Sequence, residues 1–113
     1  MHEYSIVQAL VERVDVEVRA RQAIAVHRLS VRIGELSGVE VELLTTAYAT
    51  FRERTVCERA ELDVRIVPAR WECPNCGHRI GRGDLLRCRL CDVPARLAEG
   101  DEIMLDRIEM EVP

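Results

Sequence analysis

The sequence predicts an α+β fold in which two helices pack on a three-stranded sheet, with a small cysteine-rich domain inserted before the last strand. Two segments carry apolar residues at helical spacing, three carry the alternation typical of strands, and two Cys-x-x-Cys pairs lie between the second and third of these strands. A chain of 113 residues has room for one such core with an appendage. We therefore expect residues 1–69 and 99–113 to form the α+β domain and residues 70–98 to form the inserted domain.

The first predicted helix runs from Tyr4 to about Gln22. Its apolar residues recur at spacings of three and four, which places them in one stripe: Val7, Leu10, Val11, Val14 and Val18. A competing pattern exists, because Val14, Val16 and Val18 alternate with charged residues as in a strand. The longer stripe favours the helix.

The second predicted helix follows the segment Gly34 to Gly38. One helical face carries its large apolar residues, which are Leu44, Ala47, Tyr48 and Phe51. Ser37 is the expected N-cap. We expect Glu40 to favour the dipole of this helix from its first turn, with an outer-sphere position near the amino terminus as the alternative.

Three segments alternate apolar and polar residues and are predicted strands. The first contains Leu29, Val31 and Ile33 and stops at Gly34, and the second contains Leu62, Val64 and Ile66 and ends at Pro68. The third changes phase, since Ile103 and Leu105 share one face while Ile108, Met110 and Val112 share the other. A bulge near Asp106 or Arg107 would account for that change.

Composition and charge exclude several classes of protein. Hydrophobic residues make up 48% and charged residues 32%, which is typical of a folded chain. No apolar run reaches the roughly 18 residues that would suggest a membrane-spanning helix, and the amino terminus lacks the pattern of a signal peptide. We expect a cytoplasmic protein with no membrane association. The net charge of −4 disfavours binding to nucleic acid.

The cysteine block predicts a metal site. Cys73 and Cys76 form one pair, Cys88 and Cys91 form the other, and eleven residues separate the pairs. Two such pairs complete a tetrahedron of thiolates around Zn(II), and a shell of four thiolates leaves no open position, so the zinc would be structural. Iron in a rubredoxin-like site and disulfides are alternatives, although disulfides need an oxidising compartment. We expect a zinc-ribbon-like domain that is stabilised by its metal.

Three neighbouring features have simpler roles. His78 is expected to be an exposed turn histidine, with replacement of a thiolate ligand as the alternative, and Cys57 a small buried apolar residue. Residues 70–98 carry six Arg and three acids, which invites a nucleic-acid interpretation. Four thiolates and one Zn²⁺ would remove about two of those charges, and Trp71 alone makes no base-stacking platform. A zinc-ribbon module that binds protein or nucleic acid remains the alternative function.

The amino terminus carries a second candidate metal site. The bulky His2 favours retention of Met1, so that the free amine, the His2 amide and the His2 imidazole are available to one ion. Such a nitrogen-rich set suits square-planar Ni(II) or Cu(II), and Glu3 would add an oxygen. No nucleophile with a nearby base, phosphate-binding glycine loop or paired catalytic carboxylates is present, so we do not expect an enzyme.

Together, these motifs resemble the HypA/HybF family of hydrogenase maturation factors, which are small nickel metallochaperones. The likeness covers the whole chain in order, and it rests on three segments: Met1-His2-Glu3-Tyr4-Ser5, Val31-Arg32-Ile33-Gly34-Glu35-Leu36-Ser37-Gly38-Val39, and the two cysteine pairs with Cys-Pro-Asn-Cys-Gly-His.

The resemblance implies a nickel-binding α+β domain and a zinc domain with four cysteine ligands. It implies that Met1, His2 and Glu3 bind Ni(II) as transient cargo, and that Cys73, Cys76, Cys88 and Cys91 bind Zn(II). It also implies delivery of nickel to the large subunit of [NiFe]-hydrogenase, with a HypB-type GTPase as partner. The implied oligomeric state is a monomer or weak homodimer, and relatives also serve urease maturation.

Overall fold

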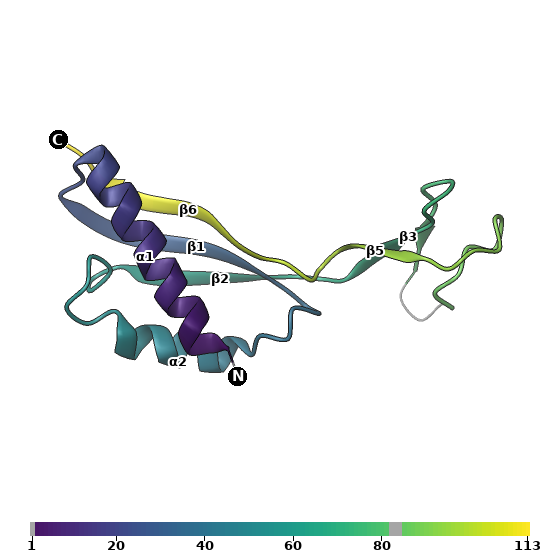
Figure 1. Ribbon diagram of the computed structural model, residues 1–113, viewed down its shortest axis with the longest axis horizontal. Helices are drawn as coiled ribbons and strands as arrows, with labels where there is room; N and C mark the ends of the chain where they lie inside the picture. Colours follow the sequence, from purple (N-terminus) through teal and green to yellow (C-terminus); the bar gives the residue numbers. More distant parts are fainter. Residues whose placement is uncertain (1, 82–84) are drawn as a thin grey trace.

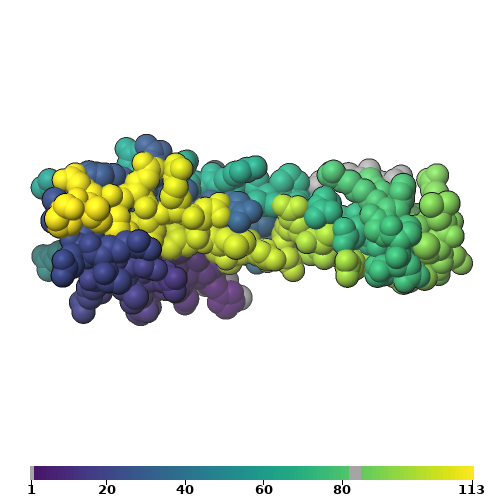
Figure 2. Space-filling model, turned by 90° about the horizontal axis from the view of Figure 1, so that it is seen from above, coloured from purple at the N-terminus to yellow at the C-terminus, as the bar shows by residue number. Residues whose placement is uncertain are grey.

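The protein is an elongated molecule with its two sheets at opposite ends. The computed structural model describes residues 2–81 and 85–113. Its principal extents are 55 × 29 × 16 Å. Figure 1 shows the helices and the longer strands at one end and the short strands β3 and β5 at the other. Figure 2 shows the cysteine-rich segment extending beyond the helical part along the long axis.

Both predicted helices are present. Helix α1 spans Glu3–Arg21 and ends at Gln22, which adopts the left-handed conformation that commonly terminates helices. Helix α2 spans Val41–Phe51. The residues around Val16 that alternate as in a strand are therefore helical. The buried residues of α1 from Val7 to Val14 recur with the helical period.

The first sheet has the strand order β2-β1-β6. Strand β1 spans Ala25–Gly34, β2 spans Glu61–Val67, and β6 spans Ile103–Glu111. Strand β1 pairs with β2 in parallel and with β6 in antiparallel orientation. Ser30 pairs with Arg107 and Val31 with Leu105, so Asp106 is the extra residue of a bulge. This confirms the bulge that the change of phase predicts.

The hydrophobic core lies between the helices and one face of this sheet. The inward face of β1 carries Leu29, Val31 and Ile33, which are at most 1% exposed. They pack with the buried stripe of α1 and with Leu44 and Tyr48 of α2. Complete burial of each such side chain stabilises the fold by about 1.5–3 kcal/mol. The helix–sheet unit therefore has a core of its own.

The start of α2 differs from the expectation in two ways. Ser37 is not its N-cap: the helix begins at Val41, and the Ser37 Oγ instead accepts a hydrogen bond from the Val39 N–H at 3.3 Å. Glu40 is the N-cap residue rather than a first-turn acid. The physical reason is the turn at Gly38, where a φ of 80° redirects the chain before a helix can start.

The inserted segment forms a second sheet, with the order β4-β3-β5. Strand β3 spans Arg70–Glu72, β4 spans Arg79–Ile80, and β5 spans Arg96–Glu99. These strands have two to four residues, too few to show an alternating pattern, and they were not predicted from the sequence. The fold is thus α+β with a zinc-ribbon-like insertion, as expected. In the part of the chain that the structure describes, no helix is long and apolar enough to cross a membrane.

Candidate metal sites

The two cysteine pairs form matching turns. The Gly77 N–H donates to the Cys73 carbonyl at 3.0 Å, and the Asp92 N–H donates to the Cys88 carbonyl at 2.9 Å. Gly77 and Asp92 adopt left-handed φ angles of 75° and 51°. Glycine tolerates that region freely, and Asp is among the few other residues that enter it. Each turn therefore directs two sulfur atoms toward the same side.

The four sulfur atoms lie close together. The Sγ atoms of Cys73, Cys76, Cys88 and Cys91 are all within 4.8 Å of one another. The Cys76 and Cys88 Sγ atoms are 3.8 Å apart. A tetrahedral ion with bonds of about 2.3 Å to sulfur requires sulfur atoms about 3.8 Å apart. The cluster therefore fits a metal such as zinc, and all five cysteines of the chain are free thiols.

Backbone N–H groups and neighbouring thiols shift the pKa values of Cys73 and Cys91 in opposite directions. The N–H groups of Cys76 and Asn75 approach the Cys73 Sγ at 3.5 and 3.4 Å, and these contacts, that of Cys76 foremost, lower the Cys73 pKa. Contact with the sulfur atoms of Cys76 and Cys73 raises the Cys91 pKa. Thiols this close resist joint deprotonation unless a cation neutralises them, so the donor set favours binding a metal.

A small apolar cluster surrounds the sulfur atoms. Cys73, Cys88 and Ile80 are buried, and Trp71 and Val93 pack against them. Cys73 and Cys88 are only 1% exposed, whereas Cys76 lies on the surface. This unit has few large apolar residues, so a metal bound by the cysteines would supply much of its cohesion.

His78 and Cys57 have the exposure that the sequence predicts. His78 is exposed and contributes its backbone carbonyl, which accepts a hydrogen bond from the Cys73 N–H at 2.9 Å. Cys57 is fully buried in the turn after α2. Burial raises the pKa of its thiol to about 11. Both are therefore separate from the four-sulfur cluster.

The amino-terminal candidate residues lie at the start of α1. Met1 lies outside the described residues. His2 is the N-cap residue and is exposed, and its carbonyl accepts the Ile6 N–H at 2.9 Å. The His2 ring is therefore accessible to a metal ion in solution.

Glu3 is buried, unlike His2. It is 6% exposed, and its Oε2 accepts a hydrogen bond from the Glu40 N–H at 3.2 Å. The amino terminus of the chain and this N–H lower the pKa of the Glu3 carboxyl to about 2. Glu3 thus carries a fixed negative charge beside the amino terminus.

The contact between Glu3 and Glu40 joins α1 to the segment before α2. The sequence offered an outer-sphere position of the Glu40 carboxylate only as an alternative, and the contact that the structure shows is from the Glu40 backbone N–H to the Glu3 carboxylate. Two acidic residues that lie 37 positions apart carry no pairing signal in one sequence. Sequence reasoning therefore missed how Glu3 is held.

The fold and the site define a class of protein: a small metal-binding protein with a helix–sheet unit and a zinc-ribbon-like unit that holds four cysteines together. The comparisons agree with this class. The model of a protein family described as "Hydrogenase/urease nickel incorporation, metallochaperone, hypA" matches residues 1–110. The chain belongs to the HypA family of nickel metallochaperones for hydrogenase maturation.

Relatives in several bacteria match nearly the full length. The hydrogenase maturation factor HypA of Shewanella halifaxensis is 37% identical over 113 residues, with 98% of each chain covered. HypA of Aquifex aeolicus is 38% identical, with 99% of each chain covered. The solution structure of the Ni metallochaperone HypA from Helicobacter pylori superposes with a TM-score of 0.76 at 32% identity, covering 100% of both chains.

Proposed function

We propose that this protein is a nickel metallochaperone that binds Ni(II) at its amino terminus and delivers it during maturation of [NiFe]-hydrogenase. The observation that carries the proposal is the family match over residues 1–110. The Helicobacter pylori relative, which is named a Ni metallochaperone, supports it across the full length of both chains. The chain acts as a carrier rather than an enzyme.

The nickel ligands in this proposal are the Met1 amine, the His2 amide and ring, and the Glu3 carboxylate. Nitrogen donors in adjacent chelate rings suit square-planar Ni(II). Exposure of His2 and the negative charge of Glu3 support the assignment. If Glu3 binds the metal directly, its carboxylate shares or gives up the hydrogen bond from the Glu40 N–H.

The proposed zinc ligands are Cys73, Cys76, Cys88 and Cys91. The spacing of their sulfur atoms fits a tetrahedral ion, and four thiolates fill its coordination shell. The zinc is therefore structural. We further propose that residues 70–98 form a separate domain, with residues 1–69 and 99–113 forming the nickel-binding domain.

The proposed partners follow from the role in maturation. They are a HypB-type GTPase and the large subunit of the hydrogenase, which the protein meets in the cytoplasm as a monomer or weak homodimer. Nucleic acid is not a partner in this proposal, because metal-bound thiolates reduce the positive charge of residues 70–98.

A nickel titration tests the proposed function. Calorimetry on untagged, zinc-loaded protein is expected to show one Ni(II) site per chain, and His2→Ala is expected to lose it. His78→Ala is the matched control, because His78 is also exposed but lies beside the cysteine cluster. Equal nickel binding by the wild type and His2→Ala would refute the proposed site.

A further inference from the structure

Three backbone segments meet where the two sheets are joined. They are residues 34–36, which begin with the last residue of β1, residues 67–69, which lead from the end of β2 to β3, and residues 100–102 between β5 and β6. Figure 1 shows the two connections converging between the sheets, near the loop that follows β1. We call this meeting point the joint. Each route of the chain into the cysteine-rich unit passes through it.

Backbone hydrogen bonds tie the loop to both connections. The Gly34 N–H donates to the Glu102 carbonyl at 2.8 Å, and the Leu36 N–H donates to the Gly100 carbonyl at 2.7 Å. The Glu35 N–H donates to the Val67 carbonyl at 2.8 Å. Consecutive residues of one loop therefore hold both connections.

Two glycines allow these backbones to approach closely. A Cβ on Gly34 would collide with the carbonyl group of Gly100. A Cβ on Gly100 would lie 2.6 Å from the Ala69 Cα, and the φ of Gly100 is +111°, which side chains rarely adopt. The joint therefore requires glycine at both positions.

The Glu35 side chain accepts a fourth hydrogen bond at the joint, from the connection between β2 and β3. Its Oε1 accepts a hydrogen bond from the Ala69 N–H at 2.7 Å. A hydrogen bond to a carboxylate is stronger than one between neutral groups. Glu35 is exposed, so this bond is not a by-product of core packing. It fixes the residue directly before β3.

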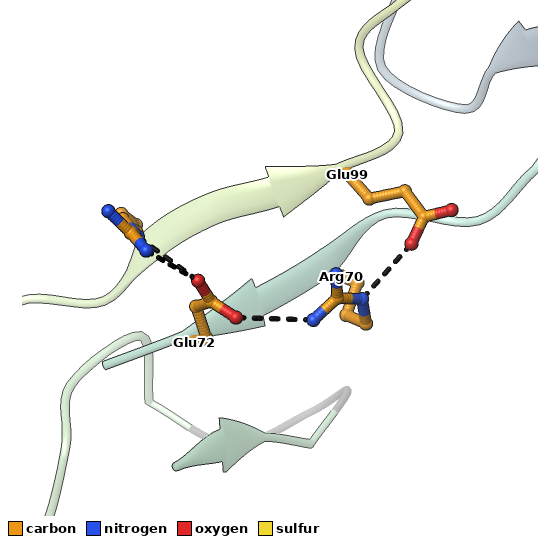
Figure 3. Close-up of polar contacts among 4 residues, drawn as sticks. Arg70, Glu72 and Glu99 are labelled. Atoms are coloured by element: carbon orange, nitrogen blue, oxygen red, sulfur yellow. Dashed lines mark hydrogen bonds and ion pairs between the residues drawn. The ribbon is translucent and has the colours of Figure 1, made fainter. Parts of the chain in front are cut away.

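Beyond the joint, the two connections lead into the second sheet, where ion pairs link β3 and β5. The Arg70 Nε donates to a Glu99 carboxylate oxygen at 3.0 Å, and Arg70 also bonds Glu72, as Figure 3 shows. Arg70 is the first residue of β3 and Glu99 is the last residue of β5. Their ion pair therefore links the two strands at the ends that face the joint. A constraint on Ala69 is thereby passed to the whole second sheet.

We propose that Glu35 is a positioning residue that fixes the orientation of the cysteine-rich unit relative to the helix–sheet unit. Its carboxylate holds Ala69 while its own backbone holds Val67. A partner that contacts both ends of the molecule then meets them in one fixed arrangement. This inference rests on the contacts of the joint and goes beyond the proposed nickel function.

Residual dipolar couplings test this proposal. Zinc-loaded, ¹⁵N-labelled protein is aligned in a stretched neutral gel, and the couplings of the two units are fitted separately. The wild type is expected to give one common alignment tensor. Glu35→Ala removes the acceptor and is expected to lose the common tensor, whereas Glu35→Gln keeps the Oε1 acceptor and should restore it.

Gly100→Ala gives a second, independent variant, because it opens the joint without touching the Glu35 side chain. It is also expected to depart from the wild-type tensor. Unequal tensors in the wild type would overturn the proposal, since no fixed orientation would exist. A common tensor retained in Glu35→Ala would overturn it as well, since other contacts would then set the orientation.

Discussion

Gly77 and Asp92 illustrate what single residues decide in the cysteine-rich unit. Both follow the second cysteine of a pair, and both have a positive φ. The sequence predicts this equivalence, since glycine and aspartate are residues that enter the left-handed region. Asp92 is also bound by Arg87 at 2.8 Å, which lowers the Asp92 pKa. That contact could not be predicted from spacing.

We predict that Gly77→Ala weakens zinc binding. Open space surrounds the position, so the cost is backbone strain alone, about 1–2 kcal/mol. That corresponds to a loss of affinity of about tenfold, since about 1.4 kcal/mol is a factor of ten. Competition with a chromophoric chelator measures it, and Asp92→Gly is the control that should not weaken the turn through strain. Unchanged affinity in Gly77→Ala would contradict this account of the turn.

We predict that the Cys57 thiol is inert in the folded protein. Because burial raises its pKa to about 11, only about one molecule in a thousand carries the thiolate at pH 8. Ellman's reagent should reach it only on unfolding in zinc-loaded protein. Comparison with Cys57→Ala shows which part of the absorbance change comes from Cys57. A thiol that reacts quickly in the folded wild type but is missing in Cys57→Ala would contradict the prediction.

The same shift has a consequence for stability. In the unfolded chain this thiol has a pKa near 9, but in the folded chain its pKa is about 11. Its contribution to the free energy of unfolding is therefore present below pH 9 and is lost as pH rises toward 11. Denaturant unfolding of the wild type and Cys57→Ala should diverge in pH dependence only within that window.

At the scale of elements, the sequence predicts the long helices and strands but not the short strands. The 19 residues of α1 and the 10 of β1 show their periods clearly. Strands β3 and β4, with three and two residues, show none. Strand β3 pairs with the nearby β4 and also with β5, which lies much further along the chain, and no local pattern records that second pairing. The start of α2 was misplaced for a related reason, since the turn at Gly38 delays it.

Helix α2 offers a matched test of the core. Leu43 and Leu44 are neighbours, but Leu43 is 49% exposed and Leu44 is fully buried. Leu44→Ala is expected to lower the free energy of unfolding by about 2–5 kcal/mol because it leaves a cavity. Leu43→Ala should change it by no more than about 0.5 kcal/mol. Chemical denaturation of zinc-loaded protein measures both, and similar losses would mean that α2 packs differently.

At the scale of the whole molecule, the two units have different sources of cohesion. The helix–sheet unit has an apolar core, whereas the other unit is built around cysteine sulfur atoms. The sequence predicts that contrast through the placement of cysteines and large apolar residues. It does not predict the joint, because the contact between Glu35 and Ala69 joins residues that lie 34 positions apart in the sequence.

We therefore predict that loss of zinc unfolds one unit and spares the other. Cys73→Ser removes a ligand and should abolish the dispersed amide signals of residues 70–98, while those of α1 and β1 persist. Two-dimensional NMR spectra show this directly, and elemental analysis of the wild type should find about one zinc per chain. Wild-type protein that is folded and reduced but free of metal would contradict the proposal.

In the proposed function, nickel binds through the free amino terminus. The Met1 amine is one of the proposed ligands, and a short Gly-Ser extension upstream converts it into an amide while leaving the cysteine cluster intact. The decisive measurement is a nickel titration of the untagged and extended proteins at equal zinc content. We expect the extension to weaken nickel binding as strongly as His2→Ala does. Equal nickel affinity in the untagged and extended proteins would place the metal elsewhere.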